Sequence, residues 1–227
     1  MITDSHQGIS LRTAAVIGGL GLLLMAILAP IAQFGVLQGV IVDGDAAATA
    51  ANIAESEGMF RVAIACFLLV AVLDVVVALA LYVVFRPVNA FLSGLTAMLR
   101  IVYGAMFAVS LTGLVTAAQL ATGSNQDSAQ VLASVDAFQT GWDIALAVFG
   151  THLLLLGILV FQSGAWRGIL GLLVLITSAG YLIDGWGRLL LPGYDLMLVT
   201  FTFVGEVVLM IWLLWESARG FPAELEG

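Results

Sequence analysis

Residues 59–85 read MFRVAIACFLLVAVLDVVVALALYVVF, and this stretch decides the fold class. A helix needs about 20 mostly apolar residues to cross a bilayer, and this run exceeds that length. Only Arg61 and Asp74 interrupt it with charge. Lipid offers no partner to exposed backbone N–H and C=O groups, so a long apolar segment of this kind is expected to cross as a helix.

Five further stretches have the same character. The chain is 62% hydrophobic and 10% charged, with a mean hydropathy of +1.13, a balance that excludes a soluble globular domain. We predict an all-α integral membrane bundle of six transmembrane helices that forms one domain over residues 1–227. The third span is longer than a bilayer requires, which favours a tilted or emerging helix. The predicted spans are 14–37, 59–85, 90–120, 138–161, 169–191 and 196–215.

The arginines predict the orientation of these spans. Arg12, Arg86, Arg167 and Arg219 all fall on one side of the six-span arrangement, whereas the opposite loops are acidic. Basic residues are retained on the cytoplasmic side of membranes. We therefore expect both termini to be cytoplasmic, in the cell membrane of a prokaryote. The net charge of −8 and the absence of Lys leave no basic surface for nucleic acid.

Two of the outer loops have helical patterns. Asp45 precedes an alanine-rich run that reads as a short capped helix. The segment from Ser124 through Asp136 reads as a helical lead-in to the fourth span. Both segments are consistent with packing at the membrane interface, and a lid over an outward cavity is the alternative.

The ionisable residues inside the spans fall into two layers. Each costs roughly 2.5 to 3.5 kcal/mol to place in the membrane, so such residues normally face the bundle interior or one another. Counting inward along each span places the first layer near the midplane, and Tyr103 extends it along a polar stripe of the third span. The midplane residues are Asp74, Arg100, Tyr103, His152 and Glu206. The residues nearer the outer interface are Arg61, Asp143, Tyr181, Asp184 and Arg188.

A lone Arg100 would be very costly near the midplane, which predicts a carboxylate partner, either Asp74 or Glu206. Two carboxylates beside one arginine favour a coupled pair that keeps one proton near neutral pH, with His152 as a possible relay. The alternative is a salt bridge that only fixes how the helices pack.

The outer layer favours a structural role. Asp184 and Arg188 are four residues apart, which is the spacing of an ion pair on one helix. Asp143 and His152 are nine apart and point to opposite faces of the fourth span. Arg61 and Arg188 can extend toward the interface along their apolar stems.

No cofactor or metal site is predicted. Cys66 is the single cysteine, and His6 in the N-terminal tail is the only other histidine. A metal held by His152, Asp74 and Glu206 is a minor alternative. The chain has no recognisable nucleophile motif, so an enzymatic role is the least favoured class.

Several motifs are specific enough to suggest a family: FRPVN (85–89), IALAVFGTHLLLLG (144–157), LG (170–171), GYLID (180–184), GE (205–206) and WLL (212–214). Together they resemble the prokaryotic multi-pass membrane family called domain of unknown function 4386. The resemblance implies a six-helix integral membrane protein and marks Arg100, His152, Asp184 and Glu206 as family-type polar positions. Family members often carry a Glu shortly after the arginine of the third span, where this chain has Tyr103, so the role of that Glu does not carry over. The family brings no established activity.

Two classes of function remain. In the leading hypothesis the midplane residues form a buried polar site that binds or passes a small species, such as a proton. In the alternative the protein is a membrane scaffold or partner subunit, or a homo-oligomer, whose buried charges only specify helix packing. A cavity that reaches Arg100 favours the first, and a dry, ion-paired core favours the second. The only partner that the sequence itself predicts is the lipid bilayer.

The topology is testable by cysteine labelling. In a Cys66→Ala background, we expect Gly227→Cys to resist a membrane-impermeant thiol reagent in intact cells, because the arginine distribution places the C-terminus in the cytoplasm. Asp195→Cys, in a predicted outer loop, is the matched control and should react. External labelling of Gly227→Cys would overturn the predicted orientation.

Overall fold

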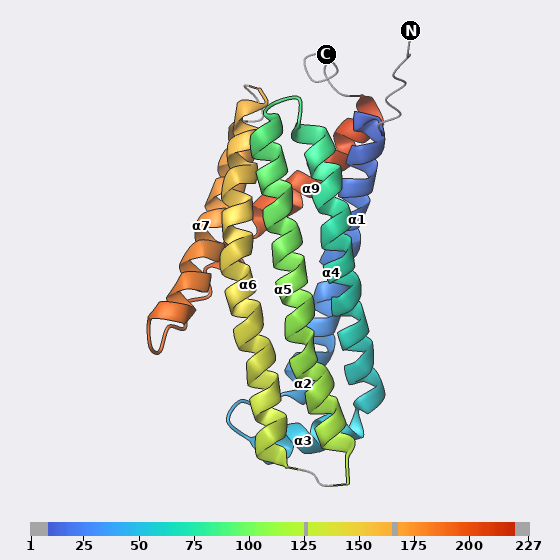
Figure 1. The fold of residues 1–227 in the computed structure, drawn as a ribbon, viewed down its shortest axis with the longest axis vertical. Coiled ribbons are helices and arrows are strands. Elements are labelled where there is room, and N and C mark those ends of the chain that lie inside the picture. The colour runs from blue at the N-terminus through green and yellow to red at the C-terminus, as the bar shows by residue number, and fades with distance from the viewer. Residues whose placement is uncertain (1–8, 125–126, 165–167, 221–227) are drawn as a thin grey trace.

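The computed structural model describes residues 9–124, 127–164 and 168–220. Six helices in this part of the chain are long and apolar enough to cross a membrane, and the described residues contain no strand. The six spans pack into one elongated bundle (Figure 1), which confirms the predicted all-α membrane architecture. The elements are α1 (Leu11–Ala32), the π-helical η1 (Gln33–Leu37), α2 (Gln38–Val40), α3 (Ala46–Glu55), α4 (Glu57–Phe85), α5 (Ala90–Thr122), α6 (Ser128–Gln162), α7 (Gly168–Leu190), α8 (Val199–Thr202) and α9 (Val204–Arg219).

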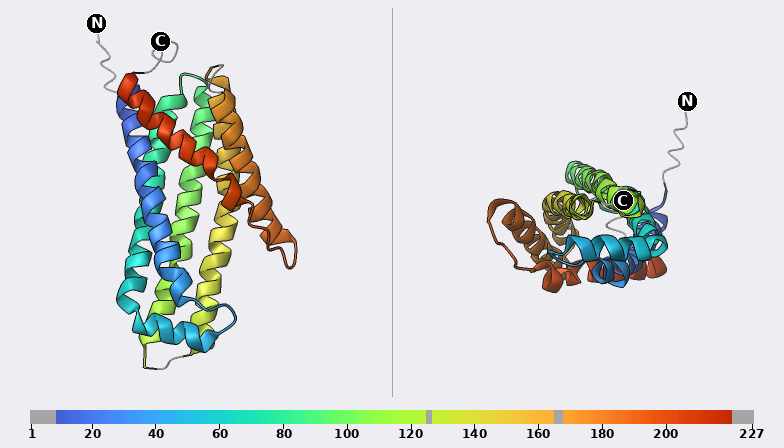
Figure 2. Two further views of the ribbon diagram at one scale, coloured as in Figure 1. Left: turned by 180° about the vertical axis from the view of Figure 1, so that it is seen from behind. Right: turned by 90° about the horizontal axis from the view of Figure 1, so that it is seen from below.

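The helices follow one another around the bundle. Helix α4 packs between α1 and α5, and α6 packs between α5 and α7. Helix α9 then crosses obliquely from α7 to α1 (Figure 2), so that it closes the remaining side. Helix α1 begins at Leu11 and α9 ends at Arg219. The start of α1 and the end of α9 lie at the same end of the bundle (Figure 1). That this end faces the cytoplasm stays a prediction, and Arg167, one of the arginines behind it, lies outside the described residues.

Helices α5 and α6 are longer than a bilayer is thick. They contain 33 and 35 residues, or about 50 Å each at 1.5 Å per residue, against a hydrocarbon core of about 30 Å. Their far ends extend well past the loop that follows α7 (Figure 1). The predicted lead-in and the predicted fourth span therefore form one continuous helix, which begins at Ser128 rather than at residue 138.

Helix α3 covers the far end of the bundle, where it packs against α5 and α6. The Asp45 side chain accepts a hydrogen bond from the Ala48 amide at 2.9 Å, which confirms the predicted capped helix. Thr49 and Asn52 then hydrogen-bond the backbone of Val42 and Val40. Helix α3 is thus fixed to the end of the first span.

The core of the half of the bundle away from the start of α1 and the end of α9 is aromatic. Phe67 of α4, Phe107 of α5, and Phe138 and Trp142 of α6 pack with ring centroids 5.2 to 6.4 Å apart. Such separations give favourable edge and offset contacts between rings. This cluster of rings holds three helices together directly beyond the midplane.

The predicted last span differs most from the structure. Residues 196–215 were expected to form a single helix, but the last span covers Val199–Arg219 and is divided at Phe203 into α8 and α9. No proline lies in this segment. The break is instead stabilised by side chains of α7, as shown below.

The approach of α4 to α5 depends on a glycine. A Cβ atom added to Gly104 would lie 3.1 Å from the Asp74 Cβ and 3.2 Å from the Ala71 carbonyl oxygen. A backbone carbonyl cannot move aside easily, so a side chain at this position requires α4 and α5 to shift by a few tenths of an ångström.

We therefore expect Gly104→Ala to destabilise the protein by about 1 to 3 kcal/mol, the usual cost of overpacking. Gly94→Ala is the matched control on the same helix, because a Cβ there meets only the Tyr82 ring, at 3.9 Å. Thermal unfolding in detergent should give a lower Tm for Gly104→Ala and no loss for Gly94→Ala. Equal Tm values would contradict the close α4–α5 contact.

Candidate functional site

Arg100 lies at the centre of the midplane cluster. It is ten residues from the start of α5, or about 15 Å from that end of the span, and its side chain is only 2% exposed. The Arg100 Nη2 atom lies 2.8 Å from the Asp74 Oδ1 atom on α4, which is fully buried. Of the two carboxylates that the sequence offered to Arg100, the structure thus pairs it with Asp74.

His152 of α6 is the second polar partner of Arg100. Its Nδ1 lies 2.8 Å from the Thr96 carbonyl oxygen, and its Nε2 lies 3.4 Å from the Arg100 Nη1. A carbonyl oxygen only accepts hydrogen bonds and a guanidinium only donates them. Nδ1 therefore carries the proton and Nε2 accepts from Arg100, which fixes His152 as a neutral imidazole in one tautomer.

Two further side chains contact the guanidinium. The Met25 Sδ atom of α1 lies 3.8 Å from the Arg100 Nη2, and the Phe149 ring centroid lies 5.3 Å from the Arg100 Cζ, within the range of a cation–π contact. Neither Met25 nor Phe149 was among the site residues predicted from the sequence. Phe149 precedes His152 by one helical turn, a spacing that signals a shared face, whereas nothing in the sequence singles out Met25.

Tyr181 and Glu206 lie on the other side of Phe149. The Tyr181 ring of α7 meets the Phe149 ring edge-on at 5.1 Å. The Glu206 carboxyl of α9 lies near the Tyr181 hydroxyl and in the electrostatic field of Arg100 and Asp74. The Glu206 side chain is half-buried. Tyr181, predicted in the outer layer, thus joins the midplane cluster, and each of the six spans contributes at least one member.

Tyr103 links the midplane to the aromatic core. Its ring stacks with Phe107 at 6.1 Å and packs against Phe149 at 4.5 Å. Its hydroxyl neighbours the Trp142 indole and the Asp74 carboxylate. With Arg100 it belongs to the predicted polar stripe of α5, the members of which are all buried: Ser93, Thr96, Arg100, Tyr103 and Ser110.

The break before α9 lies directly beside Glu206. The Thr177 hydroxyl of α7 accepts a hydrogen bond from the Gly205 amide at 3.2 Å and contacts the Thr202 carbonyl oxygen at 2.5 Å. Thr177 thereby replaces backbone hydrogen bonds that a continuous helix would make. Glu206 consequently lies in the first turn of α9, where the helix dipole favours negative charge.

The charges of the cluster do not balance. Asp74 and Glu206 are two carboxyl groups, Arg100 is one cation, and the tautomer of His152 is neutral. Among the described residues, Asp74 Oδ2 and Arg100 Nε are buried without a hydrogen-bond partner. Buried polar atoms normally have such partners, so these two positions leave bonding capacity inside the site.

The geometry does not favour a metal. The part of the chain that the structure describes contains no group of three His, Cys, Asp or Glu side chains placed to hold an ion. The lone pair of His152 Nε2 points at the Arg100 cation, which would repel a second cation. The site offers two carboxyl groups and the hydrogen-bond donors of Arg100 instead.

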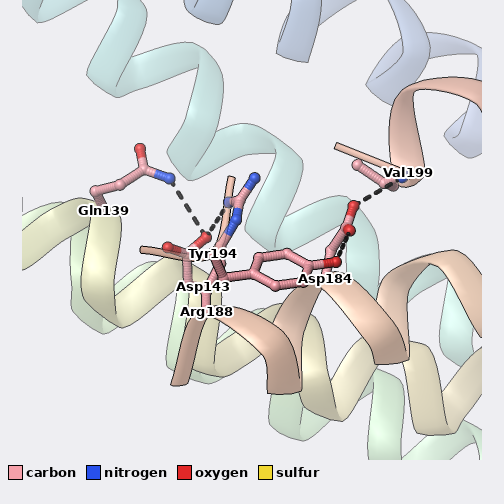
Figure 3. Close-up of polar contacts among 6 residues, drawn as sticks. All are labelled: Gln139, Asp143, Asp184, Arg188, Tyr194 and Val199. Atoms are coloured by element: carbon pink, nitrogen blue, oxygen red, sulfur yellow. Dashed lines mark hydrogen bonds and ion pairs between the residues drawn. The ribbon is translucent and has the colours of Figure 1, made fainter. Parts of the chain in front are cut away.

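The outer layer is arranged differently from the prediction. Arg188 pairs with Asp143 of α6 at 2.5 Å, and Gln139 donates a hydrogen bond to the same carboxylate at 3.4 Å. Arg61 pairs with Glu57 at 2.7 Å on an exposed face of α4. The predicted Asp184–Arg188 pair is therefore wrong, because Arg188 extends sideways to α6 rather than along its own helix (Figure 3).

Asp184 instead binds the segment between α7 and α8. Its two oxygens accept hydrogen bonds from the Tyr194 hydroxyl at 2.7 Å and from the Val199 amide at 2.8 Å (Figure 3). The second bond satisfies an amide in the first turn of α8. Partial desolvation and the bond to Asp184 raise the pKa of the Tyr194 hydroxyl, so it remains a donor at physiological pH.

The buried pair predicts a large cost for removing Arg100. Arg100→Leu leaves Asp74 buried without its cation, and we expect a loss of about 3 to 5 kcal/mol of stability. Arg61→Leu is the matched control, because its pair with Glu57 is exposed and of the kind that contributes about 0.5 kcal/mol. The yield of folded protein in detergent and its Tm should fall sharply for the first variant only. Similar tolerance at both positions would show that the buried pair is not needed for folding.

Comparison with known proteins places the chain in a family. The family described as Domain of unknown function (DUF4386) matches residues 17–216. An uncharacterised protein of Archaeoglobus fulgidus is 36% identical over 151 residues, which cover 66% of this chain and 81% of that protein. No solved structure matches. The match extends from α1 into α9, across all the helices that build the midplane site, and the chain therefore belongs to the DUF4386 family.

Proposed function

We propose that this protein binds and exchanges a proton at the midplane of the cell membrane, with Glu206 as the group that takes it up. The observation that carries the proposal is the unequal pairing of the two carboxyl groups. Asp74 pairs with Arg100 at 2.8 Å, whereas Glu206 forms no ion pair with an arginine of the described residues, and the Tyr181 hydroxyl lies near its carboxyl group. Carboxyl groups inside membrane spans are recurrent members of proton pathways.

The surroundings of Glu206 support exchange rather than a fixed structural contact. Its side chain is half-buried, while Asp74, Arg100 and His152 are 2% exposed or less. It also follows the break at Phe203, where the helix is held by side-chain bonds from Thr177. Discontinuous helices with polar groups at the break are a recurrent way to build ion sites at the bilayer midplane.

A second candidate function has its own support. Arg100, Asp74 and His152 are buried together, and the narrow crevice beside His152 has no room for a water molecule. Such a core suits a membrane scaffold or partner subunit whose buried charges fix helix packing, as buried polar groups do in some assemblies. The two candidates differ in whether Glu206 changes its protonation.

Infrared difference spectroscopy of the reconstituted protein over a pH series tests the proposal. We expect a carboxylic-acid C=O band that titrates with pH and disappears in Glu206→Gln, because an amide cannot bind the exchanged proton. Asp74→Asn should keep the band and alter its titration, because the two carboxyl groups share the field of one arginine.

Glu216→Gln is the matched control on the same helix. Glu216 is also buried, but it accepts a hydrogen bond from the Trp212 indole at 3.1 Å, ten residues away from the proposed site. The titrating band should persist in Glu216→Gln. Absence of any titrating carboxyl band in the parent protein, or its persistence in Glu206→Gln, would refute proton exchange at Glu206 and favour the scaffold.

A further inference from the structure

A second polar site lies about 15 Å from the midplane cluster along the helix axes, where α6 meets the end of α7. A pocket of about 440 Å³ opens here, formed by Asp143, Arg188 and the segment 189–194. The Arg188 and Asp143 side chains are 25% and 14% exposed, respectively. Their ion pair therefore forms part of the wall of an open pocket and is accessible to a ligand.

The depth of this pocket matches a membrane headgroup region. Arg188 is 20 residues from the start of α7, or about 30 Å, which is the thickness of the hydrocarbon core. Leu190 and Leu191 also line the pocket and are 67% and 58% exposed. The pocket wall therefore combines a charged pair with exposed apolar side chains.

The ion pair leaves bonding capacity on both of its members. Arg188 Nη1 and Asp143 Oδ1 bind each other, and Gln139 donates to the same oxygen. The far guanidinium nitrogen and the second carboxylate oxygen point away from this contact (Figure 3). A guanidinium is well suited to bind a phosphate, and a carboxylate to bind an ammonium group.

The charges around the pocket discriminate between headgroups. Arg188 and Asp143 line the pocket, while Asp184 and Asp195 lie near Tyr194 in its wall. Asp184 uses its oxygens on Tyr194 and Val199. The surplus of carboxylates disfavours a ligand with net negative charge and favours one that also carries an ammonium group.

We propose that this pocket binds the headgroup of a zwitterionic phospholipid, with its phosphate on Arg188 and its ammonium on Asp143. The lipid would belong to the leaflet at the C-terminal end of α7, and its chains would extend from the pocket toward the hydrocarbon core. This site is independent of Glu206, so its test does not depend on the proposed proton exchange.

Native mass spectrometry of the full-length, delipidated protein in detergent tests the site. We expect phosphatidylethanolamine to be retained more strongly than phosphatidylglycerol of the same chains. Arg188→Gln and Asp143→Asn should each weaken retention by about tenfold, as expected for loss of a charge-assisted bond. Arg61→Gln is the matched control and should retain the lipid as the parent does, because its ion pair lies outside the pocket.

Further measurements separate the remaining outcomes. Arg188→Lys keeps a cation for Asp143, so a folded Arg188→Lys protein with intermediate retention supports the site even if Arg188→Gln fails to fold. Equal retention of the two lipids, or retention that neither the Arg188 nor the Asp143 variants change, would show that the pair only joins α6 to α7. Binding of free phosphoethanolamine as tightly as the lipid would assign the pocket to a soluble phosphate ester and overturn the lipid proposal.

Discussion

The packing at the centre of this protein depends on the free-energy cost of burying the Arg100 guanidinium in the membrane. Arg100 carries a charge that stays protonated in proteins, so the fold must supply its counter-charge and its hydrogen-bond acceptors. Asp74 supplies the charge, His152 and Met25 supply acceptors, and Phe149 supplies a ring face. These four residues come from α4, α6 and α1. The contacts of Arg100 therefore link the orientation of α5 to the positions of three other spans.

Close helix packing is the condition for this arrangement. Gly104 lets α4 approach α5 one turn from Arg100, so that Asp74 reaches the guanidinium at 2.8 Å. Thr96 lies on α5, as Arg100 does, and its carbonyl oxygen accepts a hydrogen bond from His152 Nδ1. This bond fixes the tautomer in which His152 Nε2 can accept a hydrogen bond from Arg100. The ion pair, the histidine and the glycine therefore act as one unit, and a change in any of them alters the bonds available to the others.

Much of the fold follows from apolarity and length alone, and the exceptions have identifiable causes. All six spans were predictable, but α6 begins at Ser128 because a helix continues outside lipid where apolarity no longer marks it. A carboxylate partner for Arg100 was predictable from energetic cost, whereas the choice of Asp74 depends on helix rotation, which hydropathy does not encode.

The Asp184–Arg188 spacing suggested a pair, but partners on neighbouring segments, Asp143 and the Val199 amide, bind these side chains instead. The break at Phe203 depends on Thr177 of another helix, so no local pattern in the last span reveals it.

The bundle holds its helices in two ways. Helices α1, α4, α5 and α6 enclose the buried Arg100 cluster and an aromatic core, which resist rearrangement because their charges would lose partners. Helix α7 packs closely on α6, whereas the break before α9 and the start of α8 are held by side-chain bonds from Thr177 and Asp184. Glu206 directly follows this break, and its carboxyl lies in the field of Arg100 and Asp74. If Glu206 exchanges a proton as proposed, the change in its charge acts beside the break, whereas the buried Arg100–Asp74 pair provides a fixed field.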